Sequence, residues 1–448
     1  MFMQEFMKNK YAYVLKHFKL LYHLPSEVRI NYGIDGQSDV QIRIGKIKSF
    51  QMSGEKLKRS SVIWKEWKSV KIPFLFDLKD NEIITVINNQ VIINFDVIAS
   101  SFFLLSGWQE IGCQEKDLYN RFPFNKSIQN ELDIIKLPVV NYYFDILKTA
   151  IQIACKTNLN LRMVDNSDFV TFVSHDVDNC EDAWLQASFK ELQKGNLLTP
   201  FKLLAKKISG QDAWFNFNDI IEVEKSMDIK STFYFISDNK KNYKENRSDY
   251  KISDKKFQKV FDQIEDNDFE IGIHGGVGTH NNIQQFKEEL RNLGKNVIGN
   301  RFHLLKFLME ETPSLLEQSD IRYDSSLGFA EHFGFRNSFC FPFYLYDVKK
   351  DRSTSVLEIP LNLMDTTFRI YMDKTGDEIL SEVESLIKEI KKHNGYFSIN
   401  WHNTNLSDYK YKKWKEMFFS ILQLVRENNS SFRTGKEIIE KFNKVNQS

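Results

Sequence analysis

The feature that most constrains this fold is an alternation of strand-like and helix-like runs that begins at residue 169. Short apolar and β-branched runs predict strands, and longer runs with helical apolar spacing predict the helices between them. Strands are expected at 169–174, 231–236, 269–274, 297–302, 321–324, 356–360 and 396–402. Helices are expected at 181–194, 218–225, 255–263, 283–293, 314–318, 377–391, 411–426 and 434–442. Such alternation favours a mostly parallel sheet with functional residues at the carboxyl ends of its strands.

Residues 1–165 follow a different pattern, which predicts a smaller α+β domain ahead of an α/β domain at 166–448. Helix-like apolar spacing opens the chain, and short alternating runs follow at 28–32, 40–44, 83–87 and 91–95. Asn88-Asn89-Gln90 separates the last two runs and predicts a hairpin. Further helices are expected at 97–105 and 142–155. This part shows no cluster of catalytic residue types, so its role stays open.

The charge balance and the cysteines argue against several classes of protein. Lys and Arg (61) nearly cancel Asp and Glu (60), which disfavours nucleic acid or an anionic membrane as the main partner. The four cysteines are far apart in sequence, unlike the paired spacing of thiolate zinc sites or disulfide frameworks. The sequence shows neither a signal-peptide pattern nor an apolar run of about 20 residues. We therefore expect a cytoplasmic protein without a transmembrane segment.

Two carboxylates follow the first strand of the α/β pattern. Asp176 and Asp178 are two residues apart, so on an extended chain both face the same side. One carboxylate could bind a metal while the other remains free as a base. The alternative is that they are helix caps or loop acids, because Asp is common at both places.

Histidines end three later strands. His274 opens a glycine-rich loop, where an imidazole could approach a metal without steric hindrance. That loop could instead cradle phosphate, although the lysine of a phosphate-binding loop is missing. His303 lies two residues after Arg301, and His402 ends the strand at 396–402. Four strand ends that carry Asp or His are hard to explain by coincidence.

These motifs, taken in order, resemble the NodB-like polysaccharide deacetylases. The resemblance covers roughly residues 168–442. It depends on His175-Asp176-Val177-Asp178, Ser231-Thr232-Phe233-Tyr234-Phe235, Glu270-Ile271-Gly272-Ile273-His274, Arg301-Phe302-His303, Tyr323-Asp324-Ser325-Ser326-Leu327-Gly328-Phe329, Leu357-Glu358-Ile359-Pro360 and Trp401-His402. It implies an irregular (β/α) barrel and the activity of a metal-dependent carbohydrate esterase. Residues 1–165, with Phe102-Phe103-Leu104-Leu105-Ser106, resemble an N-terminal extension found in a bacterial subgroup of these proteins.

The resemblance also implies a divalent metal, with Zn²⁺ preferred and Co²⁺ or Ni²⁺ as alternatives. Asp178 and His274 match metal ligands of the family. The family usually has a second histidine four residues after the first, and here that position is Gly278. The third ligand is therefore expected to be His303 or His280. We favour His303, because a strand end positions a ligand more rigidly than a loop does.

The remaining functional residues follow from the same resemblance. Asp176 matches the general base, Arg301 the arginine that holds this base, and His402 the acid that protonates the departing amine. Asp365 could orient His402 or could simply serve a turn. We expect Arg336, Trp401 and Phe335 to contact the sugar, with Arg336 facing an anionic substituent. Trp401 could equally be an ordinary core residue.

The sequence therefore predicts a hydrolase that removes an N-acetyl or N-formyl group from an amino sugar. The expected substrate is an N-acetylated amino sugar, an oligosaccharide or a lipid-linked glycan, rather than a nucleic acid. An alternative is a non-catalytic carbohydrate-binding or assembly protein on a degenerate deacetylase scaffold, as suggested by Gly278 at the position of the missing ligand. Metal content and acyl release would separate these two hypotheses.

Overall fold

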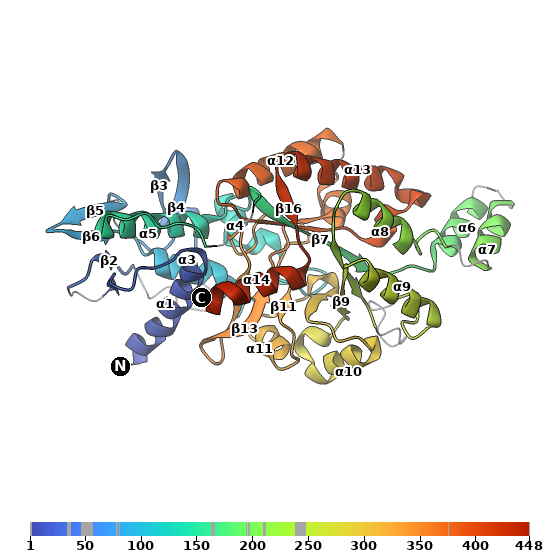
Figure 1. Cartoon of the computed structure of the whole chain (residues 1–448), viewed down its shortest axis with the longest axis horizontal. Coiled ribbons are helices and arrows are strands. Elements are labelled where there is room, and N and C mark those ends of the chain that lie inside the picture. Colours follow the sequence, from blue (N-terminus) through green and yellow to red (C-terminus); the bar gives the residue numbers. More distant parts are fainter. Residues whose placement is uncertain are drawn as a thin grey trace.

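A ten-stranded sheet is the central element of the computed structural model (Figure 1). The structure describes residues 2–33, 37–45, 57–77, 79, 81–162, 166–193, 195, 198–208, 212–237, 248–374 and 376–447. The sheet has the order β12-β13-β11-β10-β9-β8-β7-β15-β14, and β16 also pairs with β7. Its strands are β7 (Phe169–Val177), β8 (Ser231–Phe235), β9 (Glu270–Gly275), β10 (Gly299–Phe302), β11 (Tyr323–Asp324), β12 (Phe343–Asp347), β13 (Arg352–Glu358), β14 (Leu363–Met364), β15 (Tyr396–Asn400) and β16 (Ser430–Phe432).

The strands pair in parallel, except that β12 runs antiparallel to β13. All nine residues of β7 are buried, which explains its nearly continuous apolar sequence in a sheet covered by helices. The paired strands form a mixed α/β structure with a sheet curled into a half-barrel. The predicted α/β class is therefore confirmed. The strands β12, β14 and β16 were not predicted, and the last two have only two and three residues.

Most helices of this part cover the sheet, and each of these buries one face. In α9, the apolar residues Phe257, Val260, Phe261 and Ile264 are buried at helical spacing, which predicts an amphipathic surface helix. The helices of this part are α6 (Ala183–Gln193), α7 (Leu198–Ile208), α8 (Phe217–Ser226), α9 (Lys255–Asp266), α10 (Ile283–Leu293), α11 (Thr312–Glu317), α12 (Asp377–Lys391), α13 (Asp408–Glu427) and α14 (Gly435–Gln447). The helix α7 was not predicted.

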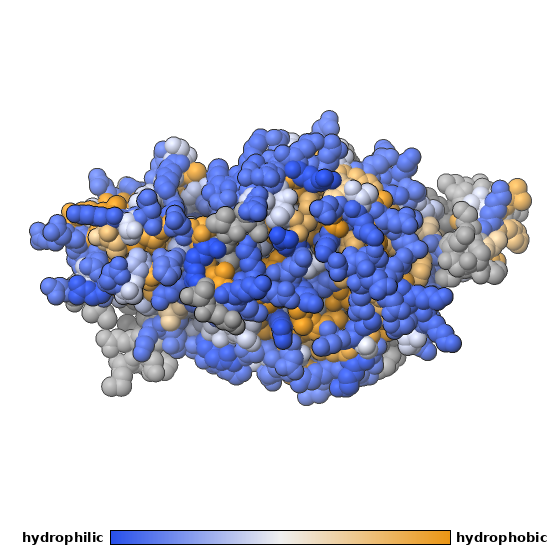
Figure 2. Space-filling view, viewed as in Figure 1, coloured by the Kyte–Doolittle hydropathy of each residue, from blue (hydrophilic) through white to orange (hydrophobic). Residues whose placement is uncertain are grey.

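The pair α6 and α7 projects from one end of the molecule, beyond the carboxyl end of β7 (Figure 1). Phe189, Leu198 and Phe201 on these helices are exposed, and apolar surface is visible there in Figure 2. Even so, none of the described helices combines the length and the apolar character that a bilayer-spanning segment requires.

The N-terminal part contains a four-stranded sheet of order β1-β2-β6-β5 and a separate pair, β3 and β4. Its elements are α1 (Phe2–Leu21), β1 (Ile30–Tyr32), β2 (Val40–Ile42), β3 (Ile63–Trp67), β4 (Val70–Phe74), β5 (Ile84–Ile87), β6 (Gln90–Ile93), α3 (Val97–Leu105), α4 (Ile128–Leu132) and α5 (Val139–Cys155). The predicted hairpin is confirmed as β5 and β6, with Asn88 and Asn89 in the left-handed conformation that its tight turn requires. The predicted helix at 97–105 is confirmed as α3.

The two parts of the chain share one apolar core, which includes residues from α1, α3 and α5 together with residues from the large sheet. Buried polar groups also join them. The backbone N–H of Tyr344 donates to Nε2 of His17 over 2.9 Å, and burial lowers the pKa of His17 to about 3. The predicted domain boundary at 165/166 touches residues 163–165, which lie outside the described residues, and it stays a prediction.

Candidate active site

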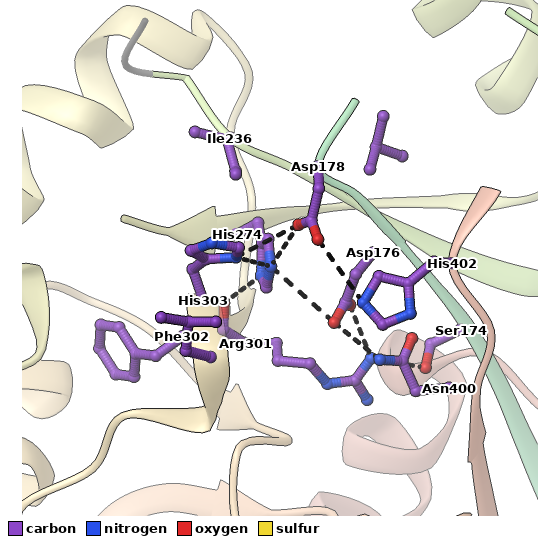
Figure 3. Close-up of polar contacts among 12 residues, drawn as sticks. Ser174, Asp176, Asp178, Ile236, His274, Arg301, Phe302, His303, Asn400 and His402 are labelled. Atoms are coloured by element: carbon purple, nitrogen blue, oxygen red, sulfur yellow. Dashed lines mark hydrogen bonds and ion pairs between the residues drawn. The ribbon is translucent and has the colours of Figure 1, made fainter. Parts of the chain in front are cut away.

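Three side chains of the types that can bind a metal meet at the carboxyl ends of parallel strands of the large sheet (Figure 3). Asp178 follows β7, His274 lies in β9, and His303 follows β10. The Nε2 atom of His274 lies 3.2 Å from Oδ1 of Asp178, and Nδ1 of His303 also lies 3.2 Å from that oxygen. The two nitrogens are themselves 3.2 Å apart. The three donor atoms therefore form a nearly equilateral triangle.

This triangle fits a small divalent cation. Tetrahedral zinc with bonds of about 2.0–2.2 Å separates its ligand atoms by about 3.3–3.6 Å, and the observed spacing of 3.2 Å is close to the lower end of that range. Oδ1 of Asp178 is a buried oxygen without a hydrogen-bond donor in the described structure, as expected for a ligand atom. Burial by itself would raise the pKa of Asp178, but the nearby His303 and His274 hold it well below its usual value. The ionised form of Asp178 is therefore favoured, which is the form that a metal ligand needs.

The backbone fixes the orientation of the His274 ring. Its Nδ1 donates to the carbonyl oxygen of Arg301 over 2.8 Å, because a carbonyl can only accept. In the neutral ring the Nε2 atom thus keeps a lone pair for a metal, which is the usual arrangement for a histidine ligand held by a second hydrogen bond. The register of the sheet explains this contact, since Arg301 of β10 pairs with His274 of β9.

Asp176 lies beside the triangle and is held by two strong donors. Its Oδ1 accepts from Nη1 of Arg301 over 2.9 Å, and its Oδ2 accepts from Nδ2 of Asn400 over 2.7 Å. Burial would raise the pKa of Asp176, but Arg301, His274 and His402 together lower it. Asp176 is therefore an ionised carboxylate with a fixed orientation. Its Oδ2 atom lies 3.8 Å from Nε2 of His274.

Arg301 is a fully buried cation with several acceptors. Besides Asp176, it donates to Oγ of Ser174, to the carbonyl oxygen of Ser325 and to Oγ of Ser325, over 2.8–2.9 Å. These bonds leave little freedom to the guanidinium group, so Arg301 also fixes the position of Asp176. Neither Asn400 nor Ser325 was predicted as a site residue. For Asn400 a signal existed, because it lies two residues before His402 on the same face of the strand.

His402 and Asp365 form a second pair at the pocket. Nδ1 of His402 donates to Oδ1 of Asp365 over 2.7 Å, and the backbone N–H of His402 donates to Oδ2 over 2.8 Å. Burial alone would lower the pKa of His402, but Asp365, Asp178 and Asp176 raise it to about 10. A cation bound at Asp178 would offset part of this attraction. Nε2 of His402 is 3.6 Å from Oδ2 of Asp178, so the imidazole faces the predicted metal site.

The alternative ligand His280 does not join this group of donors. Its ring packs against Phe302 with 6.3 Å between centroids, and burial with the nearby Lys306 lowers its pKa to about 4. The loop that leads to it turns at Gly278, whose φ of 92° disfavours any side chain. A histidine at Gly278 would therefore be strained, and the structure offers His303 in its place.

The three predicted sugar contacts lie away from the pocket surface, and this corrects the prediction. Arg336 forms two hydrogen bonds with the Glu110 carboxylate, over 3.0 and 2.7 Å, and is 3% exposed. Phe335 is fully buried in the core. Trp401 is fully buried against Trp414 and Phe418. All three carry structural contacts, because a motif shows the type of a residue but not which way its side chain points.

The pocket over the site is a cavity of about 320 Å³. Its lining includes all three triangle residues, Asp176 and His402. Leu304, directly after His303, also lines the cavity. Other walls come from segments that the sequence did not implicate, namely Tyr119, Arg121, Trp214, Arg369, Ile370, Tyr371 and Tyr411. The size suits one small substrate group, at the lower end of common ligand pockets. Tyr119 and Arg121 belong to the N-terminal part, which therefore contributes to the pocket.

Arg121 connects the N-terminal part to the turn that carries His303. Its Nη1 donates to the carbonyl oxygen of Leu304 over 3.0 Å, and its Nε donates to Asp117 over 2.7 Å. Leu304 and Leu305 have φ angles of 61° and 54°, a left-handed backbone that costs about 1–3 kcal/mol per residue. Contacts such as that of Arg121 must hold this turn in place.

We expect Arg121→Met to weaken metal binding about tenfold, the lower end of what losing a partner of a metal ligand usually costs. The variant keeps the aliphatic stem but releases the carbonyl of Leu304, so His303 becomes less well positioned. Competition with a chromophoric zinc chelator measures the affinity. Arg29→Met is the matched control, because Arg29 is an exposed arginine of the same part of the chain. Equal affinities in the two variants would contradict the positioning role.

Among the comparisons with known proteins, a family model matches the N-terminal part only. Residues 1–156 match the model of a family of unknown function, DUF7033. No curated protein matches the chain. Among solved structures, one assigned as a polysaccharide deacetylase from Mycobacterium smegmatis has a TM-score of 0.41 and 14% identity, covering 62% of this chain and 92% of that one.

Two further structures are also distantly similar. Puue allantoinase has a TM-score of 0.42 and 11% identity, over 62% of this chain and 91% of that one. A CE4 family pseudoenzyme from Bacillus anthracis has a TM-score of 0.31 and 10% identity, over 62% of this chain and 66% of that one. Scores and identities this low carry no argument about the activity of this chain.

Proposed function

We propose that this protein is a metal-dependent hydrolase that removes an N-acetyl, or alternatively an N-formyl, group from an amino sugar of a polysaccharide or glycolipid precursor. The observation that carries the proposal is the triangle of Asp178, His274 and His303 beside the ionised Asp176. Each of the three donor pairs is 3.2 Å apart, and a base and an acid stand next to them. A cytoplasmic location and the sequence boundary between the two domains stay predictions.

Different residues of this chain carry out the separate steps of the reaction. A divalent ion held by Asp178, His274 and His303 would polarise the acyl carbonyl and lower the pKa of a bound water. Asp176 accepts the proton of the attacking water, and Arg301 with Asn400 keeps its carboxylate ionised and correctly directed. His402 donates a proton to the amide nitrogen as the C–N bond breaks, and Asp365 stabilises the imidazolium before that step. The products are a carboxylate and a free amine.

The choice of an amino sugar comes from the resemblance of the ordered motifs, and the pocket is compatible with it. Tyr119, Tyr371 and Tyr411 line the cavity. Aromatic rings of this kind offer apolar faces to the C–H faces of a sugar and hydroxyl groups to its oxygens. They take the place that the sequence assigned to Trp401 and Phe335.

The test combines metal content with acyl release. Purified protein should hold close to one divalent ion per chain and release acetate from N-acetylated mono- or oligosaccharides when loaded with Zn²⁺ or Co²⁺. Removal of the ion with a chelator should reduce release to background, and re-addition should restore it. Parallel N-formyl substrates identify the acyl group.

Two results would overturn the proposal. A folded protein that takes up no divalent ion would refute the metal site. A protein that holds the ion but releases no acyl group from any N-acylated sugar would favour the non-catalytic carbohydrate-binding alternative.

A further inference from the structure

One arginine of the pocket lacks an acidic partner in the described part of the chain. The other three arginines near the site are each neutralised, Arg121 by Asp117, Arg301 by Asp176 and Arg336 by Glu110. Arg369 lines the same cavity as Asp178 and His402, and the described residues offer it no ion pair. A cation left without a counter-charge in a substrate pocket calls for a physical explanation.

The residues around Arg369 position its guanidinium group but do not satisfy all of its hydrogen-bond donors. The group lies over the ring of Tyr411, with 4.9 Å between the guanidinium carbon and the ring centroid. Nη1 is 3.5 Å from the hydroxyl of Tyr411, which is at the outer limit of a hydrogen bond. Nε is buried and has no hydrogen-bond partner among the described residues. Tyr411 therefore orients the cation, and at least one donor remains free.

Arg369 also has a fixed spacing from the catalytic residues. It lies in a π-helical segment, Thr367–Met372, that begins two residues after Asp365. Segments of π-helix are rare and often occur at functional sites. Asp365 is locked to His402, so the start of the segment cannot move away from the reaction centre. The segment that carries the guanidinium therefore starts close to a residue that is hydrogen-bonded at the reaction centre.

The charges around the pocket leave this cation available for a ligand. Asp176 is committed to Arg301 and Asn400, Asp178 to the two histidines, and Asp365 to His402. A divalent ion would add further positive charge. A planar guanidinium with free donors binds a carboxylate or a phosphate through paired hydrogen bonds.

We infer that Arg369 binds an anionic substituent, a carboxylate or a phosphate, carried by the same sugar unit or its neighbour as the acyl group. The inference depends on the proposed function for the identity of the reaction, and it narrows the substrate to acidic amino sugars. It also moves the anion-binding role that the sequence suggested for Arg336 to a residue that is free to perform it.

The experiment compares three sugars on the metal-loaded enzyme: N-acetylglucosamine, its 6-phosphate, and an N-acetylated amino sugar with a uronic carboxylate. In the wild type, kcat/KM should be higher for one or both anionic sugars than for the neutral one. In Arg369→Met, the ratio of anionic to neutral kcat/KM should fall about tenfold or more, as expected for a lost hydrogen bond to a charged group. Arg369→Lys should retain part of the ratio. The two anionic sugars distinguish carboxylate from phosphate.

A matched control and a second readout keep the test independent of turnover. Arg291→Met removes an exposed arginine from α10 that does not line the pocket, and it should leave the ratio unchanged. Calorimetric titration of the same sugars into metal-loaded Asp176→Asn measures binding where no reaction occurs. If no sugar is hydrolysed, the proposed function fails, whereas an unchanged preference for anionic sugars in Arg369→Met, by either readout, overturns the inference.

Discussion

Asp176→Asn should lower kcat for acyl release by about 10²- to 10⁴-fold, the usual contribution of general acid–base catalysis, while the metal stays bound. The amide has nearly the shape of the carboxylate and can still accept from Arg301, but it cannot take a proton from water. The metal donors Asp178, His274 and His303 are untouched, so the loss should appear in catalysis and not in metal content.

The control for this variant must separate the loss of the base from the loss of a buried charge. Removing Asp176 leaves the buried Arg301 without its counter-charge, which can cost about 3–5 kcal/mol of stability. Asp96→Asn makes the same change at a buried carboxylate that caps α3. The residues that Asp96 contacts lie outside the pocket. Thermal unfolding, metal analysis and acetate release are measured on both variants. Wild-type kcat in a folded, metal-loaded Asp176→Asn protein would refute the role of Asp176.

Much of the site could be predicted because its residues lie at regular places in a repeating pattern. Asp178, His274 and His303 each stand within a few residues of a strand end, and neighbouring parallel strands bring those ends to one edge. Period-two alternation likewise placed Arg301 and His303 on one side of their strand. The sequence could therefore predict that these side chains meet, while their catalytic roles remain proposals.

The failures occurred where a contact joins distant parts of the chain. Arg336 pairs with Glu110, which lies more than two hundred residues earlier in the chain. No local sequence pattern indicates that pairing. The contribution of Tyr119 and Arg121 to the pocket wall could not be predicted from the sequence either, because the N-terminal part contains no catalytic pattern of its own. Trp401 and Phe335 were predicted from the chemistry of aromatic rings, but aromatic residues fill cores more often than they line pockets.

Short elements were missed for a different physical reason. The strands β14 and β16 contain two and three residues, too few to show any periodicity, and they exist because β15 and β7 offer them backbone partners. Tertiary pairing, not local propensity, determines such strands. The π-helical segment that carries Arg369 is also short, with six residues, and no periodicity in the sequence predicted it.

His303→Ala should abolish stoichiometric metal binding, whereas His280→Ala should leave it intact. Loss of a partner that only supports a metal ligand weakens metal binding about 10- to 100-fold, so loss of a ligand itself should exceed about a hundredfold. His303 supplies one corner of the donor triangle, and His280 packs on Phe302 outside it. Both residues are histidines that follow strands of the same sheet, His303 directly after β10 and His280 in the loop after β9, which makes His280→Ala a matched control.

The comparison of these two variants shows which histidine replaces the metal ligand that is missing at Gly278. If the loop after β9 rearranged on metal binding to bring His280 in, His280→Ala would lose the ion and His303→Ala would keep it. The left-handed turn at Gly278 and the burial of His280 oppose that rearrangement. Metal analysis after dialysis, together with circular dichroism to confirm folding, distinguishes the outcomes. We expect the ligand to have moved from the loop after β9 to the end of β10, where the N-terminal part supports it through Arg121 and the carbonyl of Leu304.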